Sequence, residues 1–205
     1  RLKNHNPLKT DHWDVKWPGL PRIDLATHSG NSAAGDFCYS LNLTDIHTGW
    51  TETQAVLGKG QEAVRGALQA IRQTLPFALR GIDSDNGSEF INDMVSGLMK
   101  DLMIEQTKSR PRHSNDNGLV ESKNAAVIRK HMGYGYIAAG HAADIDAFYQ
   151  DSLNPYLNLH RPCGQPELVM DSRGKAKLVY RRYLTPLEKL REVLDGLPES
   201  QRELK

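Results

Sequence analysis

The sequence contains no run of about 18 apolar residues, so no segment is long enough to cross a bilayer as a helix. The start of the chain also lacks the basic, apolar and small-residue order of a secretory signal peptide. Cysteine is rare, and Cys38 and Cys163 stand alone without the CxxC spacing of a structural zinc site or a redox pair. These absences predict a cytoplasmic protein in a reducing compartment, with no membrane partner.

An excess of charge of one sign is also missing. The chain carries 26 basic and 25 acidic residues, so its formal net charge of +1 indicates no class of partner. Its 205 residues, of which 39% are hydrophobic, are enough for one globular domain with a short appendage. The chain begins at Arg1 rather than Met, and residues 1–17 are polar. We therefore expect 1–17 to be a linker or the tail of an upstream domain.

Hydrophobic and polar residues alternate in the first part of the chain, with the period of two that is typical of strands. Residues 22–27 and 37–44 show this alternation, and Gly49 marks a turn before a third strand at 50–56. The short connection predicts that the second and third strands are antiparallel. The pattern then changes to that of an amphipathic helix over 61–75.

The next part of the chain alternates between helical and strand-like patterns. We expect strands at 79–84 and 104–109, a polar loop at 110–118, and helices at 90–102, 119–132 and 142–159, the last kinked at Pro155. Three strands followed by alternating helices and strands predict a mixed α/β sheet with helices on its faces.

A C-terminal extension occupies residues 161–205. After a connection that contains Gly and Pro, the basic stretch 175–183 has the character of a strand. Its arginines, Arg181 and Arg182, suit either DNA binding or packing, and the sequence does not separate the two. Thr185 and Glu188 then form a capping box that opens a short helix, with Pro186 at its first position.

Three carboxylates occupy positions suited to chemistry. Asp24 has the opposite strand parity to Ile23 and Leu25, Asp85 directly follows the strand 79–84, and Glu121 lies in the first turn of a helix. Each has an ordinary structural explanation: an exposed strand residue, a turn residue and a partner of the helix dipole. Together, and at this spacing, the three acids indicate a catalytic role more strongly than any one of them does alone.

The sequence around these acids resembles the DDE recombinases, which include retroviral integrases and bacterial insertion-sequence transposases. Thirty-five residues lie between Asp85 and Glu121, and this interval is close to the spacing that the family shares. The matching blocks are RIDLAT at 22–27, DIHTGW at 45–50, IDSDNGSEF at 82–90 and NGLVESKN at 117–124. The resemblance covers roughly residues 18–160.

The resemblance implies a ribonuclease H-like fold over 18–160, with a mixed five-stranded sheet flanked by helices. It also implies a polynucleotidyl transferase that cleaves DNA and transfers strands. Asp24, Asp85 and Glu121 would be both the catalytic residues and the ligands of Mg2+ or Mn2+, in a site with two ions. Oxygen ligands suit these hard cations, and two ions can stabilise the attacking and leaving oxygens at phosphorus.

Two further acids fall within the matching blocks. Asp83 shares strand parity with Asp85, but only Asp85 precedes the Asn-Gly turn and has the family's interval to Glu121. Asp85 is therefore the expected ligand. Asp45 lies beside the turn between two strands, where a structural role is expected.

Basic residues are concentrated between positions 108 and 131. They could follow a phosphate backbone, and the alternative is a solvated basic face. The expected DNA-binding residues are Lys108, Arg110, Arg112, His113, Lys123, Asn124, Arg129 and Lys130. By resemblance, the partners are transposon ends, target DNA and further copies of the chain, and the location is the nucleoid-associated cytoplasm of a bacterium.

Two other functions remain open on the sequence. A metal-dependent nuclease of the same fold would only hydrolyse DNA, and a domesticated transposase relative would bind DNA without cutting it. All three acids are present, which argues against the second alternative. The acids alone do not separate cutting from joining.

Overall fold

The computed structural model describes residues 17–32, 34–84, 105–108, 124–170 and 176–196. These residues form a five-stranded sheet, in the order β3-β2-β1-β4-β5, and a separate two-stranded sheet. The strands of the large sheet are β1 (Pro21–Thr27), β2 (Cys38–Asp45), β3 (Thr51–Leu57), β4 (Gly81–Ser84) and β5 (Glu105–Lys108). β1, β2 and β3 are antiparallel, whereas β4 and β5 run parallel to β1. The predicted mixed α/β class is confirmed.

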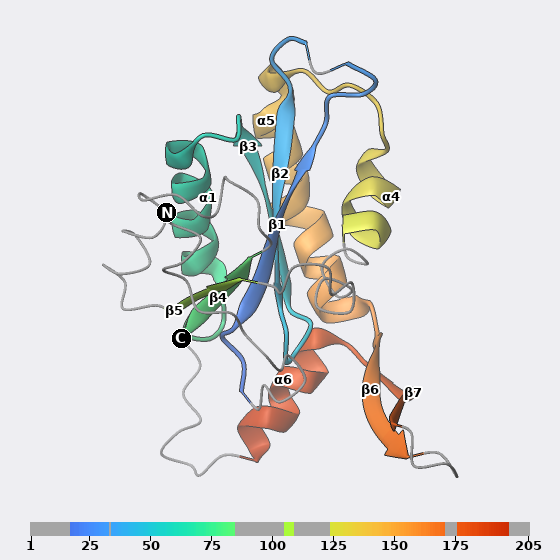
Figure 1. The fold of residues 1–205 in the computed structure, drawn as a ribbon. Helices are drawn as coiled ribbons and strands as arrows, with labels where there is room; N and C mark the ends of the chain where they lie inside the picture. The colour runs from blue at the N-terminus through green and yellow to red at the C-terminus, as the bar shows by residue number, and fades with distance from the viewer. Residues whose placement is uncertain (1–16, 33, 85–104, 109–123, 171–175, 197–205) are drawn as a thin grey trace.

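One face of the sheet packs against α1 (Gln61–Thr74), and the alternation in the strands decides which side chains it buries. Ile23, Leu41 and Leu43 point into this apolar core, where they meet the hydrophobic stripe of α1. Leu190 of α6 (Pro186–Asp195) completes the core from the C-terminal part of the chain. Figure 1 shows α1 along one side of the sheet and α6 below it.

The other face is covered by helices from later in the chain. They begin with η2 (Asn124–Arg129) and α4 (Lys130–Met132), and continue after a connection with η3 (Ala139–His141) and α5 (Ala142–Phe148). The chain then stays helical through two wider, π-helical stretches, η4 (Tyr149–Leu153) and η5 (Tyr156–His160). A second apolar core, which includes Ala26, Val127 and Tyr149, lies between these helices and the sheet.

The long helix formed by α5, η4 and η5 also covers the outer edge of β3. Asn158 accepts a hydrogen bond from the Thr51 N–H at 2.8 Å and donates one to the Thr51 carbonyl at 2.9 Å. Asn154 does the same for Thr53, at 3.0 and 3.1 Å. Four helical residues rise roughly 6 Å and two strand residues about 6.8 Å, so the two asparagines reach alternate strand residues. Backbone groups that could pair with another strand are thereby satisfied.

The smaller sheet is a hairpin of β6 (Cys163–Met170) and β7 (Ala176–Leu184). In Figure 1 it extends away from the large sheet, beside α6. The basic strand predicted at 175–183 is confirmed as β7, but the prediction of a connection before it was wrong, because β6 occupies that stretch. Pro166 obscured the strand pattern, since proline is tolerated in a strand only at an edge or a bulge. It lies at the irregularity between Gln165 and Glu167.

Most other predicted elements in the described residues are also found. The strands at 22–27, 37–44 and 50–56 and the helix at 61–75 match β1, β2, β3 and α1 within about one residue at each end, while β4 begins two residues later than predicted. The helix predicted at 142–159 runs through Pro155 with wide turns on both sides. The helix at 90–102, the loop at 110–118 and the first part of the helix at 119–132 lie outside the described residues. None of the helices that are described is long and apolar enough to cross a membrane.

Candidate active site

Asp24 lies on the central strand β1 and points away from the apolar core that contains Ile23. Its side chain is half-buried, and its Oδ1 atom accepts a hydrogen bond from the Leu25 N–H at 2.8 Å. The predicted parity of Asp24 is therefore confirmed. The backbone contact restricts the orientation of the carboxylate on the strand.

Asp24 belongs to a row of polar residues that crosses three strands. In the strand register it pairs with Asn42 of β2, which in turn pairs with Thr53 of β3. The hydroxyl of Thr53 donates to Oδ1 of Asn42 at 3.5 Å. The next row towards the sheet's other end pairs Thr44 with Thr51, whose hydroxyl oxygens are 3.3 Å apart. This part of the face thus carries oxygen-bearing side chains where the opposite face carries leucines.

The strand β4, which carries Asp83, lies beside β1. Ile23 pairs with Ser84, and Arg22 pairs with Asp83, across parallel strands. Chemistry in open α/β sheets is usually placed at the C-terminal ends of parallel strands, and the described part of β4 ends at Ser84. Asp85 and Glu121 lie outside the described residues, so their expected place beside Asp24 stays a prediction.

Asp45 has the structural role that the sequence indicated. It is fully buried at the end of β2, where its Oδ1 accepts from the Gly19 N–H at 2.8 Å. Its Oδ2 accepts from the backbone N–H of Thr48 at 2.8 Å and from the Thr48 hydroxyl at 2.7 Å. The side chain therefore fixes the turn between β2 and β3 and attaches it to the segment that enters β1.

A buried hydrogen-bonded chain at the other end of this face was not predicted. Nε2 of His28 lies 2.7 Å from the Ser40 hydroxyl, which lies 2.7 Å from the Tyr149 hydroxyl. Burial, together with the positive charge of Arg129, lowers the pKa of His28 to about 4. Among the described residues, Nδ1 of His28 has no hydrogen-bond partner. The placement of Ser40 on a buried strand was the one sequence signal that could have indicated this chain.

A second buried group, Glu52, lies at the edge of the sheet. Its carboxylate accepts from Nε1 of Trp50 at 2.8 Å and from Nδ2 of Asn154 at 3.0 Å. Burial nevertheless raises the pKa of Glu52 to about 7. The carboxylate lines a cavity of about 490 Å³ between Thr74 of α1 and the long helix. No pattern in the sequence indicated this cluster, because Glu52 and Asn154 are about 100 positions apart.

The sequence has a relative among curated proteins. No family model matches the sequence. The sequence is similar to the uncharacterized protein y4rM of Sinorhizobium fredii (strain NBRC 101917 / NGR234), with 37% identity over 182 residues that cover 88% of this chain and 51% of that protein. The chain therefore spans about half the length of this relative.

Two solved structures are similar in fold. The catalytic core domain of BIV integrase matches with a TM-score of 0.50 and 19% identity, over 70% of this chain and 85% of that one. A chain of the simian T-cell lymphotropic virus intasome in complex with PP2A regulatory subunit B56 gamma matches with a TM-score of 0.57 and 13% identity, over 77% and 53%. The chain has an integrase-like fold. At these identities the likeness concerns the fold, and function has to be argued from the site.

In this integrase-like fold, Asp24 suits one ligand position of a hard divalent cation. It supplies a carboxylate oxygen, the ligand type that Mg2+ prefers, and its orientation is restricted by the Leu25 N–H. Within the part of the chain that the structure describes, no group of three His, Cys, Asp or Glu side chains could hold a metal. A complete site would need ligands from the segments that contain Asp85 and Glu121.

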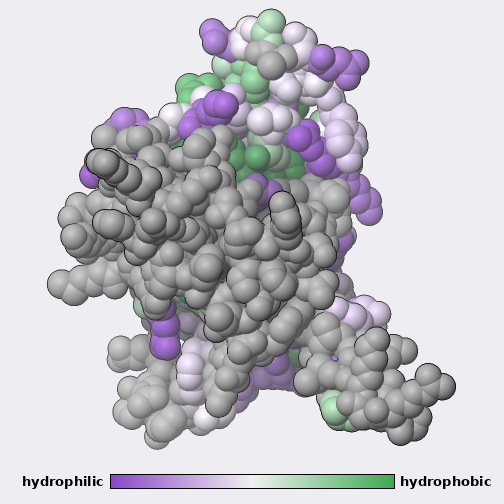
Figure 2. Space-filling model, viewed as in Figure 1, coloured by the Kyte–Doolittle hydropathy of each residue, from purple (hydrophilic) through white to green (hydrophobic). Residues whose placement is uncertain are grey.

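Of the predicted DNA-binding residues, the structure describes the side chains of two. Arg129 lies at the end of η2 with its guanidinium carbon 5.2 Å from the centre of the Tyr134 ring, and Lys130 is exposed. For Lys108 and Asn124 only the backbone is described, in β5 and η2. Arg110, Arg112, His113 and Lys123 lie outside the described residues. Figure 2 shows hydrophilic and hydrophobic residues interspersed around α4, α5 and the β1–β2 connection, as is usual for exposed surface.

Proposed function

We propose that this chain is the catalytic core of a DNA transposase or integrase, which cleaves DNA strands and joins them through Asp24, Asp85 and Glu121. The observation that supports the proposal most is the position of Asp24. It is a half-buried carboxylate on the polar face of the central strand, in a fold similar to the catalytic core domain of BIV integrase. The proposed fold family is the ribonuclease H-like group.

The register of β1 and β4 limits the distance between the first two acids. Ile23 pairs with Ser84 across parallel strands, which lie about 4.8 Å apart. Asp24 and Asp85 each follow one of these residues by a single peptide, whose Cα atoms are about 3.8 Å apart. The proposal therefore requires the two Cα atoms to be no more than about 12 Å apart, a separation that a shared pair of ions can span for side chains on the same face.

Asp24, Asp85 and Glu121 would together hold two Mg2+ or Mn2+ ions through their carboxylate oxygens. Bound there, the ions would supply Lewis-acid stabilisation of charge at the attacking and leaving oxygens. The attacking group would be water in cleavage and a DNA 3′-hydroxyl in joining, so no covalent protein intermediate is needed. Arg129, Lys130 and the other predicted basic residues would position DNA through phosphate contacts.

The proposal is tested with the purified chain, a labelled DNA duplex that carries the transposon end, and Mn2+ or Mg2+. Asp24→Asn should reduce cleavage and joining by more than about 100-fold, because even residues that only orient a metal ligand contribute up to this factor. Asp144→Asn is the matched control, since this carboxylate is exposed on α5 and should leave both reactions unchanged. Joined products that disappear with Glu121→Gln would support the transposase, whereas cleavage without joining would indicate a nuclease.

A second measurement tests metal binding by itself. Binding can be measured even where cleavage and joining require other parts of a longer protein. Calorimetric titration of Mn2+ into the chain should give binding that Asp24→Asn weakens and Asp144→Asn preserves. Equal Mn2+ affinity in wild type and Asp24→Asn would remove Asp24 from the site and overturn the proposal.

A further inference from the structure

The hairpin of β6 and β7 presents an exposed aromatic surface that the proposed active site does not use. Tyr180 and Tyr183 of β7 are 52% and 64% exposed, and Met170 at the end of β6 is also exposed. Large aromatic side chains on a soluble domain normally bury most of their area. Two of them on one short strand therefore indicate a contact surface.

An extra residue in β7 places both tyrosines on the same face of the hairpin. Residues three apart on a regular strand point to opposite faces. Here Gln165 pairs with Arg182 and Glu167 pairs with Val179, so a step of two residues on β6 matches a step of three on β7. This is the pattern of a β-bulge, which redirects side chains.

Gly164 confirms that the two rings lie together. A methyl group built on Gly164 would lie 3.1 Å from Cδ1 of Tyr180 and 3.4 Å from Cε1 of Tyr183. Both rings therefore pack closely over the same glycine, and a larger residue would displace them. The result is a pair of adjacent exposed rings, supported from below by backbone.

Positive charge predominates in the sequence around the tyrosines, although Glu167 of β6 is an exposed acid in register with Val179 and Arg182 is paired with Glu192. Residues 172–187 of the sequence include five cations and no acid: Arg173, Lys175, Lys177, Arg181 and Arg182. Arg181 is exposed between the two tyrosines in the sequence. An apolar protein partner would match the rings but not this density of positive charge, whereas a polyanion matches both the charge and its spread along a strand.

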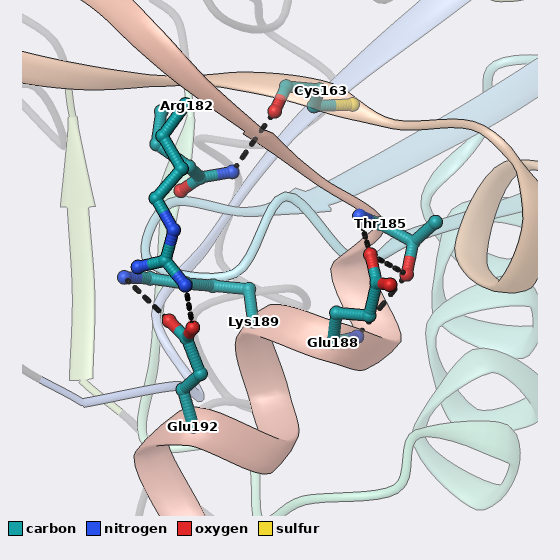
Figure 3. A network of polar contacts seen from close by, with 7 residues as sticks. Cys163, Arg182, Thr185, Glu188, Lys189 and Glu192 are labelled. Atoms are coloured by element: carbon teal, nitrogen blue, oxygen red, sulfur yellow. Dashed lines mark hydrogen bonds and ion pairs between the residues drawn. The ribbon is translucent and has the colours of Figure 1, made fainter.

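The hairpin is attached firmly to the core. Arg182 pairs with Glu192 of α6, and Lys189 lies 3.9 Å from the same carboxylate. The capping box closes the turn between β7 and α6: the Glu188 N–H donates to the Thr185 hydroxyl at 3.2 Å, and the Thr185 N–H donates to Glu188 at 2.7 Å. Figure 3 shows these contacts around the start of α6. Because Leu190 of α6 lies in the apolar core, these contacts connect the hairpin to the core through α6.

We infer that Tyr180, Tyr183 and Arg181 form a platform that binds a DNA strand with unpaired bases. Bases stack on exposed aromatic rings without regard to sequence, and cations beside them contact the phosphates. The inference goes beyond the proposed function, which uses the carboxylate site and the basic residues between positions 108 and 130. It adds a second DNA-binding surface, suited to single-stranded DNA next to a cleaved end.

The test measures binding rather than cleavage, so it can fail independently of the proposed function. Fluorescence anisotropy is recorded for the chain with a labelled 20-nucleotide oligothymidylate and with a duplex of the same length. Tyr180→Ala/Tyr183→Ala should weaken binding to the oligothymidylate by at least about 10-fold, since the loss of one stacked base lowers affinity by roughly 5- to 150-fold. Binding to the duplex should weaken much less.

Three controls keep the result interpretable. Tyr156→Ala removes a tyrosine of similar exposure on η5 and should leave binding unchanged. Tyr180→Phe/Tyr183→Phe retains the rings and should retain affinity, which separates stacking from hydrogen bonding by the hydroxyls. Asp144→Asn, which changes an exposed carboxylate on α5, should bind the oligothymidylate like wild type.

Arg181→Gln gives an independent readout. It should reduce the slope of log affinity against log salt by about 0.7, the contribution of one phosphate contact on a single strand. Unchanged affinity of the alanine double variant, with an unchanged melting temperature, would overturn the inference. An equal loss for single strand and duplex would also overturn it, because the surface would then bind by charge alone.

Discussion

The two faces of the sheet at β1 and β2 bury side chains of different polarity. Every residue of β2 is buried, yet its side towards α1 carries Tyr39, Leu41 and Leu43, while its other side carries Ser40, Asn42 and Thr44. Apolar burial needs only complementary packing. Burial of polar groups has a desolvation cost that hydrogen bonds largely offset, so it adds little stability. A contribution to stability therefore does not account for the polar face, whereas the proposed site at Asp24 would use it.

The largest expected effect on stability belongs to the apolar face. Leu41 is fully buried in the core against α1, so Leu41→Ala removes its packing and leaves a cavity. We expect a loss of about 3–5 kcal/mol in the free energy of unfolding, measured by urea denaturation. Leu57→Ala, at an exposed position on the neighbouring strand β3, is the matched control and should change it by less than about 0.5 kcal/mol. Similar losses in the two variants would contradict the assignment of the core.

Glu52 is an exception to this division, because it pairs in register with Leu43 and so lies on the apolar side. Its carboxylate reaches Asn154 at the sheet edge, and burial raises its pKa from 4.5 to about 7. The protonated form therefore favours folding below pH 4.5, and this contribution is lost as pH rises to about 7.

Glu52→Gln imitates the protonated side chain and should remove this pH dependence. Relative to wild type, the variant's free energy of unfolding should rise by about 3 kcal/mol between pH 4.5 and pH 8. Urea denaturation across this range measures the difference. Glu62→Gln, at an exposed position in α1, should follow the wild-type profile. A constant difference between Glu52→Gln and wild type at every pH would show that the carboxyl is not perturbed.

The elements that could be predicted from the sequence are those that depend on neighbouring residues along the chain. Alternation gave β1 to β3, helical periodicity gave α1, and the capping box at Thr185 and Glu188 gave the start of α6. The parity of Asp24 followed from the same alternation. These features depend on neighbours along the chain, so they can be read without knowledge of the fold.

The features that were missed depend on distant partners. β6 became a strand despite Pro166 because β7 pairs with it and accommodates the proline at a bulge. Asn154 and Asn158 have helical spacing. Their hydrogen bonds to the edge of β3 depend on the packing of the helix against the sheet, which no local pattern indicates. His28 joins Tyr149 through Ser40 across about 120 positions of sequence, and no local pattern indicates such a chain.

The smallest expected effect comes from His28, on the polar side of β1, and it has the opposite sign to that of Glu52. Because the folded pKa of His28 is lowered from 6.5 to about 4, its neutral form favours folding above pH 6.5, and this contribution is lost as pH falls to about 4. The two groups oppose each other between pH 4.5 and 6.5, so the wild-type curve alone would not separate their contributions.

His28→Gln separates the two contributions, because its amide can still bond to the Ser40 hydroxyl but does not titrate. The stability advantage of wild type over this variant should shrink by about 1–3 kcal/mol from pH 7 to pH 4. Urea denaturation at each pH measures it, and His141→Gln, at an exposed position, is the matched control. An advantage that stays constant with pH would mean that the pKa of His28 is the same in the folded and unfolded protein, and that this end of the polar face tolerates the protonated imidazole.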